Sequence, residues 1–203
     1  MPVALTLCDR SPELVQAWRR YFSDESGIKI ASQNILTLDV DALAVPANAF
    51  GFTDGGVDIA ISKEIFDWRL QDRLRAVIDQ EHAGELLVGQ AMVMPTNSAR
   101  LRYVVVAPTM RVPADVSDTV NAYLAMRAIL RAVEAHNRAN KGNPANQIRS
   151  LALPGLCTGT GKMAPERAAF QMWTAYRSIV LGDLDWSKTL EKQVAHDRKM
   201  RSK

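Results

Sequence analysis

Residues 40–61 read VDALAVPANAFGFTDGGVDIAI, and this stretch places three kinds of structure in immediate succession. The apolar run from Leu43 to Val45 suits a buried strand. A loop follows from Asn48 to Gly56, and Val57 and Ile61 then stand one helical turn apart. Because a strand, a loop with adjacent glycines and a helix start are the parts of many anion sites, the stretch predicts one.

A second stretch repeats this order. Residues 153–166 read LPGLCTGTGKMAPE, between an apolar run at 151–153 and a helical pattern at 165–180. Helix N-termini carry unpaired N–H groups and the positive end of the helix dipole. Glycines allow those N–H groups to converge on an anion without a Cβ in the way. Two such loops at neighbouring strand ends predict a site that holds a diphosphate from both sides.

The common nucleotide motifs fit this second loop poorly. A Walker A loop requires a glycine where Leu156 stands and a serine or threonine where Met163 stands, so the pair Gly161-Lys162 does not complete one. Gly159-Thr160-Gly161 with Ala164 does fit the looser dinucleotide fingerprint. Too little chain follows, however, for a βαβ unit with its ribose-binding acid.

Cysteine and histidine chemistry has little support either. Met163 occupies the position at which a Cys-x5-Arg phosphatase loop starting at Cys157 needs its arginine. Cys157 is better read as a small buried side chain than as a nucleophile. The histidines lack metal-ligand spacing, which leaves zinc sites and hydrolase triads without a basis, and we expect no metal or redox cofactor. They are His82, His136 and His196.

Outward from the two loops, strands and helices alternate. Apolar runs typical of strands lie at 3–7, 28–31, 43–45, 91–94, 103–107 and 151–153. Helical spacing recurs over 12–22, 57–65, 70–78, 120–133 and 165–180. This alternation predicts a three-layer α/β/α fold with a mixed central sheet and helices on both faces. We divide the chain into one domain, residues 1–181, and a basic tail, residues 182–203.

Composition and charge narrow the setting. The 203 residues carry a net charge of +3, and residues 188–203 hold six basic and two acidic side chains, so the rest of the chain is close to neutral. A basic tail can bind nucleic acid, but we favour a frayed, solvated end. The two cysteines, the absence of a signal-peptide pattern and the lack of a long apolar run favour a cytoplasmic protein with no membrane partner.

Taken together, the two loops resemble those of the macro domain family. That family has a strand ending in Asn-Ala-Ala-Asn, a glycine run, and Val-Asp-x-Ala-Ile opening a helix. Here Val45-Pro46-Ala47-Asn48 leads to Gly55-Gly56-Val57-Asp58 without a gap in spacing. Cys157-Thr158-Gly159 resembles the family's Ser-Thr-Gly, and Gln33-Asn34-Ile35 resembles its Gly-Asp-Ile. The Thr-Gly-Thr-Gly-Lys-Met version is similar to a bacterial or phage-type branch.

The resemblance implies a function and a role for each matching residue. It implies binding of ADP-ribose or an ADP-ribosylated macromolecule, and in some members hydrolysis of ADP-ribosyl esters or O-acetyl-ADP-ribose. Asn34 would accept a hydrogen bond from the adenine amino group, and Ile35 would line the pocket. Asn48 would hydrogen-bond the distal ribose. Asp58 would orient or activate the attacking water, as a carboxylate near an ester can.

The resemblance assigns the diphosphate to backbone N–H groups of the two loops. Lys162 is an added cation beside them and is expected to strengthen binding. The ligand-binding set implied in this way is Asn34, Ile35, Ala47, Asn48, Gly55, Gly56, Val57, Cys157, Thr158, Gly159, Thr160, Gly161, Lys162 and Met163. The catalytic pair would be Asn48 and Asp58.

Several positions depart from the family pattern. Val45 replaces the first asparagine, and the glycine run has shrunk to two residues. Gly161 stands where many relatives carry an aromatic ring, for which Phe50, Phe52 or Met163 are candidate substitutes. Three interpretations therefore stay open: a hydrolase, a non-catalytic ADP-ribose reader, and an assembly protein that has kept the fold. Asn48 with Asp58 favours the first, and Val45 with the short glycine run favours the others.

Overall fold

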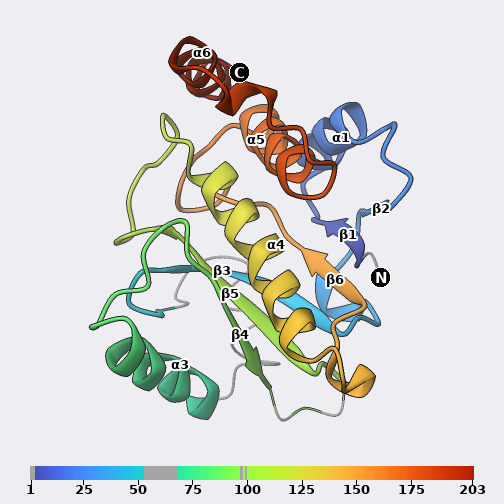
Figure 1. The fold of residues 1–203 in the computed structure, drawn as a ribbon, viewed down its shortest axis with the longest axis vertical. Helices are drawn as coiled ribbons and strands as arrows, with labels where there is room; N and C mark the ends of the chain where they lie inside the picture. Colours follow the sequence, from blue (N-terminus) through green and yellow to red (C-terminus); the bar gives the residue numbers. More distant parts are fainter. Residues whose placement is uncertain (1–2, 53–67, 97, 99) are drawn as a thin grey trace.

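The computed structural model describes residues 3–52, 68–96, 98 and 100–203, and its strands form one mixed sheet (Figure 1). The strand order is β2-β1-β6-β3-β5-β4, and all neighbours are parallel except β4 and β5. The strands are β1 (Ala4–Cys8), β2 (Ile28–Ala31), β3 (Ala42–Asn48), β4 (Met92–Pro95), β5 (Tyr103–Met110) and β6 (Ser150–Leu153). No helix among these residues has the length and apolar character needed to cross a bilayer.

Helices cover both faces of the sheet. They are α1 (Pro12–Tyr21), α3 (Trp68–Glu81), α4 (Asn121–Ala139), α5 (Pro165–Ile179) and α6 (Leu190–Arg201), with short 3₁₀ turns η1 (Ile35–Thr37), η2 (Pro144–Asn146) and η3 (Asp185–Ser187). Helices α1, α4 and α5 lie over one face, and α6 lies outside α5 (Figure 1). This arrangement confirms the predicted three-layer fold with a mixed sheet.

Alternating side chains of the central strands build two separate cores. Ala42 and Ala44 of β3 join the core beneath α1, α4 and α5, whereas Leu43 and Val45 join the core beneath α3. Strand residues point alternately to opposite faces, so near-continuous apolar runs are what a sheet covered on both sides requires. The side chain of Val45 is fully buried, which explains an apolar residue at this position.

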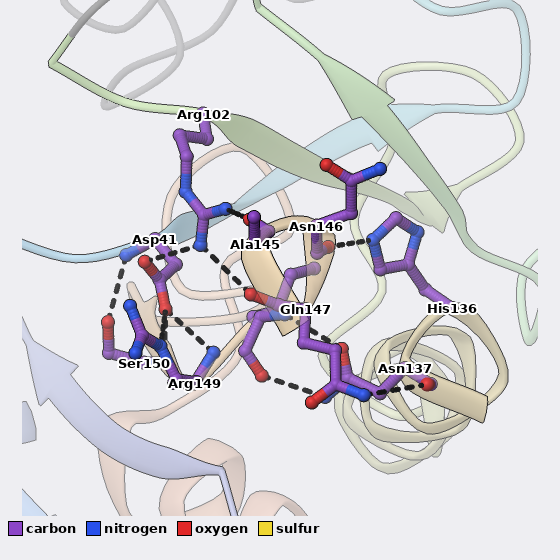
Figure 2. A network of polar contacts seen from close by, with 10 residues as sticks. Asp41, Arg102, His136, Asn137, Ala145, Asn146, Gln147, Arg149 and Ser150 are labelled. Carbon is purple, nitrogen blue, oxygen red and sulfur yellow. Dashed lines mark hydrogen bonds and ion pairs between the residues drawn. The ribbon is translucent and has the colours of Figure 1, made fainter. Parts of the chain in front are cut away.

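At the amino-terminal edge of the sheet, Asp41 joins β3 to β6 (Figure 2). Its carboxylate accepts hydrogen bonds from the backbone N–H groups of Arg149, at 2.7 Å, and Ser150, at 3.1 Å. Arg102 pairs with the same carboxylate at 2.6 Å and also donates to the Gln147 carbonyl oxygen at 2.9 Å. This network fixes the spacing of the two strands whose opposite ends carry the predicted anion loops.

The elements expected from the sequence are found within a few residues where the structure describes them. Strand β2 has the expected bounds, and β3 and β5 extend three residues further than the apolar runs indicated. Ser11 caps α1 as expected, because its hydroxyl accepts the Leu14 N–H at 3.2 Å. The helix expected over 57–65 lies outside the described residues.

The expectation of a frayed C-terminal end is wrong. Residues 190–201 form α6, which begins at a Thr189 cap. The helix places Met200 in the core beneath α1, α4 and α5, called the main core below. The carbonyl oxygen of Met200 accepts a hydrogen bond from Gln171 of α5 at 3.2 Å. The helix presents little apolar surface, so its sequence resembles a solvated charge run although one end of it is anchored.

Candidate functional site

A cavity of about 590 Å³ lies at the carboxyl ends of the parallel strands β1, β6, β3 and β5. In open α/β sheets, this is the edge at which ligands bind. The described residues that line it are Asp9, Ser11, Leu14, Pro46, Ala47, Asn48, Phe52, Thr109, Met110, Pro113, Gly155, Cys157, Thr158, Gly159, Thr160, Gly161 and Pro165. The two loops singled out in the sequence therefore border one cavity.

Asn48 ends β3 and shapes the first loop. Its side-chain oxygen accepts the N–H groups of Phe50, at 3.0 Å, and Phe52, at 3.1 Å. The register with β5 shifts between Ala47 and Asn48, so the chain leaves the sheet at this point. Because the oxygen is engaged in the turn, a ligand would meet the NH₂ group of the Asn48 side chain.

The second loop is folded tightly on itself. The Met163 N–H donates to the Cys157 carbonyl oxygen, and the Lys162 N–H donates to the Gly159 carbonyl oxygen, each at 2.9 Å. Cys157 and Lys162 have φ angles of 66° and 53°, a left-handed conformation that is strained for residues with a Cβ. Such strain persists only where the surrounding structure enforces it, and it is frequent at binding sites.

This fold leaves a run of backbone N–H groups available. Among the described residues, the N–H groups of residues 156–161 have no hydrogen-bond acceptor. They belong to residues that line the cavity, apart from the buried Leu156. Successive unpaired amides beside a cavity form a concave anion site. The loop therefore has the chemistry to bind phosphate oxygens through the backbone, independent of side-chain charge.

Two helix N-termini add positive potential to the same cavity. Ser11 at the start of α1 and Pro165 at the start of α5 both line it. Ala164, the residue that precedes α5, provides no side-chain cap. An uncapped helix start leaves N–H groups for a ligand, and the helix dipole favours an anion there. The cavity thus suits a ligand that carries negative charge.

Asp9 links the start of α1 to the second loop, and both of these line the cavity. One of its oxygens accepts the Ser11 N–H at 2.9 Å, and the other accepts the Gly155 N–H at 3.2 Å. The carboxylate thereby holds the start of α1 against the second loop. A methyl group on Gly155 would approach Leu14 Cδ2 to 2.5 Å, so only glycine fits at this junction without a shift.

Cys157 has the environment of a structural residue. Its side chain is buried, and burial raises the pKa of the thiol to about 12. The thiolate is the nucleophilic form, so a thiol with so high a pKa is inert near neutral pH. This agrees with the sequence-based view of Cys157 as a small buried side chain.

The aromatic candidates for the missing ring occupy different places. Phe52 lines the cavity, is 37% exposed, and lies under the Arg75 guanidinium, 4.8 Å from its ring centroid. Phe50 instead packs against Arg111, with 5.2 Å between guanidinium and centroid. Met163 is buried in the main core. Of the three, only Phe52 presents a ring to the cavity.

The structure brings together about half of the predicted site residues. Those that line the cavity are Ala47, Asn48, Cys157, Thr158, Gly159, Thr160 and Gly161. Gly55, Gly56, Val57 and Asp58 lie outside the described residues. Lys162 is exposed and pairs with Asp115 at 3.8 Å, and the buried Ile35 packs in the α3-side core. The Asn34 side-chain oxygen caps η1 through the Leu36 N–H at 3.1 Å.

Sequence reasoning missed part of the lining. Asp9, Thr109 and Pro113 border the cavity although none was singled out. Asp9 had a readable signal, because it stands between an apolar strand run and a Ser-Pro helix start. Thr109 and Pro113 had none, since they reach the cavity only through the position of β5 in the sheet.

Comparison with known proteins gives one family. A family model described as "Macro domain" matches residues 44–172. An uncharacterized protein of Aquifex aeolicus (strain VF5) is 27% identical over 177 residues, covering 80% of this chain and 97% of the relative. The matched segment includes the two loops described above.

Solved structures share the fold at low sequence identity. The macrodomain of Mycobacterium tuberculosis DarG is 18% identical, with a TM-score of 0.58, over 72% of this chain and 88% of its own. The Oceanobacillus iheyensis macrodomain with ADP is 16% identical, with a TM-score of 0.58, over 82% and 90%. Thermosipho africanus DarTG in complex with ADP-ribose is 13% identical, with a TM-score of 0.53, over 84% and 50%.

Proposed function

The chain belongs to the macro domain family, and from that premise we propose that the cavity at the carboxyl ends of its strands binds ADP-ribose, free or attached to a macromolecule. The observation that carries this proposal is the run of N–H groups at 156–161 that find no acceptor in the described part of the chain, beside a helix start without a side-chain cap. Backbone amides and helix dipoles are suited to a diphosphate. The solved relatives that contain ADP and ADP-ribose support the choice of nucleotide.

The distal ribose is assigned to residues that line the cavity, and adenine to two residues that are not part of its described lining. Asn48 and Phe52 line the cavity and would contact the distal ribose, through an NH₂ group and a ring face. Asn34 and Ile35 precede and begin η1, and they are proposed for adenine as the family resemblance implies. The Asn34 oxygen already accepts one backbone N–H, and an amide oxygen has a second lone pair for an adenine amino group.

Titration calorimetry with ADP-ribose tests the binding proposal. We expect saturable binding of ADP-ribose, with weaker binding of AMP, which lacks the second phosphate and the distal ribose. NAD serves as a second comparison, because its distal ribose carries a nicotinamide that the Asn48 end of the cavity would have to admit. Equal heats for all three ligands, or no heat with ADP-ribose at millimolar concentration, would contradict the assignment.

We propose further that the site hydrolyses ADP-ribosyl esters or O-acetyl-ADP-ribose. Asp58 would accept a proton from the attacking water, and the amide loop would stabilise negative charge that develops on the ligand. Asp58→Ala is expected to lower turnover at least about tenfold and to leave ADP-ribose affinity nearly unchanged. Release of free ADP-ribose from an esterified substrate measures the first, and calorimetry measures the second. Loss of binding instead would make Asp58 a structural residue.

A non-catalytic reader is the second candidate. The position that holds an asparagine in the family pattern is here the fully buried Val45, and the Asn48 oxygen is engaged in its own turn. Both features reduce the polar groups beside the distal ribose while leaving the amide loop intact. A reader would bind ADP-ribose with the same preference and release none from any of the esterified substrates.

Replacement of Lys162 by glycine tests two properties of this residue, its positive charge and its strained backbone conformation. Lys162→Gly is expected to stabilise the fold by about 1 kcal/mol, because glycine adopts the left-handed conformation without a steric cost. Its exposed ion pair with Asp115 contributes little. If the ammonium group also assists diphosphate binding, the same variant loses ADP-ribose affinity by a small factor. Urea unfolding and calorimetry on one preparation give both results, and a destabilised Lys162→Gly would refute the strain argument.

A further inference from the structure

A second cavity, of about 400 Å³, lies between α5, η3 and α6. The proposed ADP-ribose site (the nucleotide cleft) lies at the start of α5, whereas residues further along that helix line the second cavity. Phe170, Trp173 and Trp186 give it aromatic walls, and polar and charged side chains complete the lining. It falls within the size range of small-molecule sites. None of its lining residues borders the cleft, so the proposed ADP-ribose site does not account for it.

Unpaired polar atoms concentrate around this cavity. Trp173 Nε1, Arg177 Nε and His196 Nε2 are buried and have no hydrogen-bond partner among the described residues. All three residues line the cavity. In the described part of the chain, the one other buried side-chain nitrogen or oxygen without a partner is Trp18 Nε1, in the main core. A buried polar group without a partner is costly, so three at one cavity require an explanation.

The charges around the cavity favour an anion. Arg177 pairs with Asp183 at 2.6 Å, and Lys192 pairs with Asp185, so those charges compensate one another. Lys199 also lines the cavity and has no carboxylate within ion-pair distance among the described residues. Its ammonium group lies 5.6 Å from the Phe170 ring centroid.

We propose that this cavity is a binding site for a small aromatic oxyanion, a ring that carries a carboxylate or a phosphate group. The oxyanion would accept hydrogen bonds from Trp173 Nε1, Arg177 Nε and the His196 ring, and it would neutralise Lys199. The ring would pack among the aromatic walls. Charged hydrogen bonds of this kind are about twice as strong as neutral ones.

Access to this site depends on how α6 packs against α5. Because the three nitrogens are buried, a ligand reaches them only when α6 shifts slightly on α5. Met200 is the buried residue of α6, and the His196 ring is stacked on Trp186, with 4.4 Å between centroids and 12° between planes. Hydrogen bonds also hold α6, from Arg201 to the Asp118 carbonyl oxygen at 2.7 Å and from Gln193 to the Ser187 carbonyl oxygen at 3.0 Å, so the shift is a local one, and a ligand that bridges α5 and α6 would hold the helix further.

The test is titration of the purified full chain with phenyl phosphate and with benzoate, followed by calorimetry and by amide chemical shifts. Benzyl alcohol and inorganic phosphate are the controls for the ring alone and the anion alone. We expect saturable binding of one of the two aromatic anions, weaker binding of both controls, and shifts that map to residues 170–200. The preferred anion identifies the oxyanion as a phosphate or a carboxylate. Absence of saturation, or shifts confined to the nucleotide cleft, would overturn the proposal.

Variants that remove one polar group each sharpen the result. Trp173→Phe removes one unpaired N–H and keeps a ring, and His196→Phe removes another and keeps the stack on Trp186. Each is expected to weaken binding at least fivefold, as is Lys199→Gln. Trp18→Phe removes the unpaired N–H in the main core and is the matched control, with unchanged affinity expected. Equal affinity across all four variants would refute the site, and unchanged ADP-ribose binding in each shows that the cleft is intact.

Discussion

Gly161→Ala is expected to destabilise the protein by about 2 kcal/mol and to weaken ADP-ribose binding about a hundredfold. The added methyl group would lie 2.6 Å from the Cys157 carbonyl oxygen and 2.7 Å from Val116 Cγ2. That carbonyl oxygen is the acceptor of the Met163 N–H, so relief of the contact stretches the hydrogen bond that closes the loop. The Gly161 carbonyl oxygen also accepts the Val116 N–H at 3.0 Å, and this bond must shift too.

The loss of affinity follows from the position of the amides. A loop that moves to relieve the clash carries the N–H groups of 156–161 with it. Two lost hydrogen bonds to a charged phosphate, at about 1.5 kcal/mol each, correspond to about a hundredfold in the dissociation constant. The predicted loss of ADP-ribose affinity rests on the proposed function, whereas the predicted loss of stability rests on the loop geometry alone. Either prediction can therefore fail without the other.

The same loop supplies matched controls. A methyl group on Gly159 meets nothing within 4 Å, so Gly159→Ala is expected to leave stability unchanged or slightly higher. Gly155→Ala meets side-chain atoms of Leu14, Thr158 and Asp9, which are able to yield, so its cost should fall between the other two. Urea unfolding measures the series. The loss of stability should increase from Gly159→Ala through Gly155→Ala to Gly161→Ala, and any other order would contradict this account of the loop.

The sequence was sufficient for the fold because each local signal agreed with its neighbours. Apolar runs at 43–45 and 103–107 belong to strands buried on both faces, and such runs are distinctive. Where boundaries were missed, as in β3 and β5, strand pairing continued past the apolar residues through Pro46 to Asn48. Pairing of this kind depends on the partner strand, and a local pattern does not contain it.

The site was less predictable because its geometry is made by contacts distant in sequence. Asp9 lies 146 positions from Gly155, yet one hydrogen bond between them joins the segment after β1 to the second loop of the cleft. Gly161 is readable as a flexible residue, but part of the clash that makes it necessary comes from Val116, which belongs to a segment distant in sequence. Helix α6 was misread because its one buried side chain, Met200, leaves almost no periodic signal among many charges.

Asp41→Ala is expected to remove about 3 kcal/mol of the free energy of unfolding at neutral pH. The Asp41 side chain is 16% exposed and accepts hydrogen bonds from Arg102 and from the N–H groups of Arg149 and Ser150 (Figure 2). Its removal leaves Arg102 without its carboxylate and the two N–H groups without an acceptor. Asp39→Ala, two residues away at an exposed position, is the matched control and should change stability by less than about 0.5 kcal/mol.

Acid supplies an independent measurement of the same network. Burial would raise the pKa of Asp41, but the Arg149 N–H, the Arg102 guanidinium and the Ser150 N–H together hold it below its ordinary value of 3.8. A lowered folded-state pKa stabilises the protein fully at pH values above the unfolded-state pKa, and that stabilisation disappears as the pH falls through the folded-state value. The difference between wild type and Asp41→Ala should therefore be constant from about pH 7 to about pH 5 and shrink below about pH 4. Urea unfolding across this range measures it, and a difference that persists undiminished in acid would show that the Asp41 charge contributes nothing to the junction of β3 and β6.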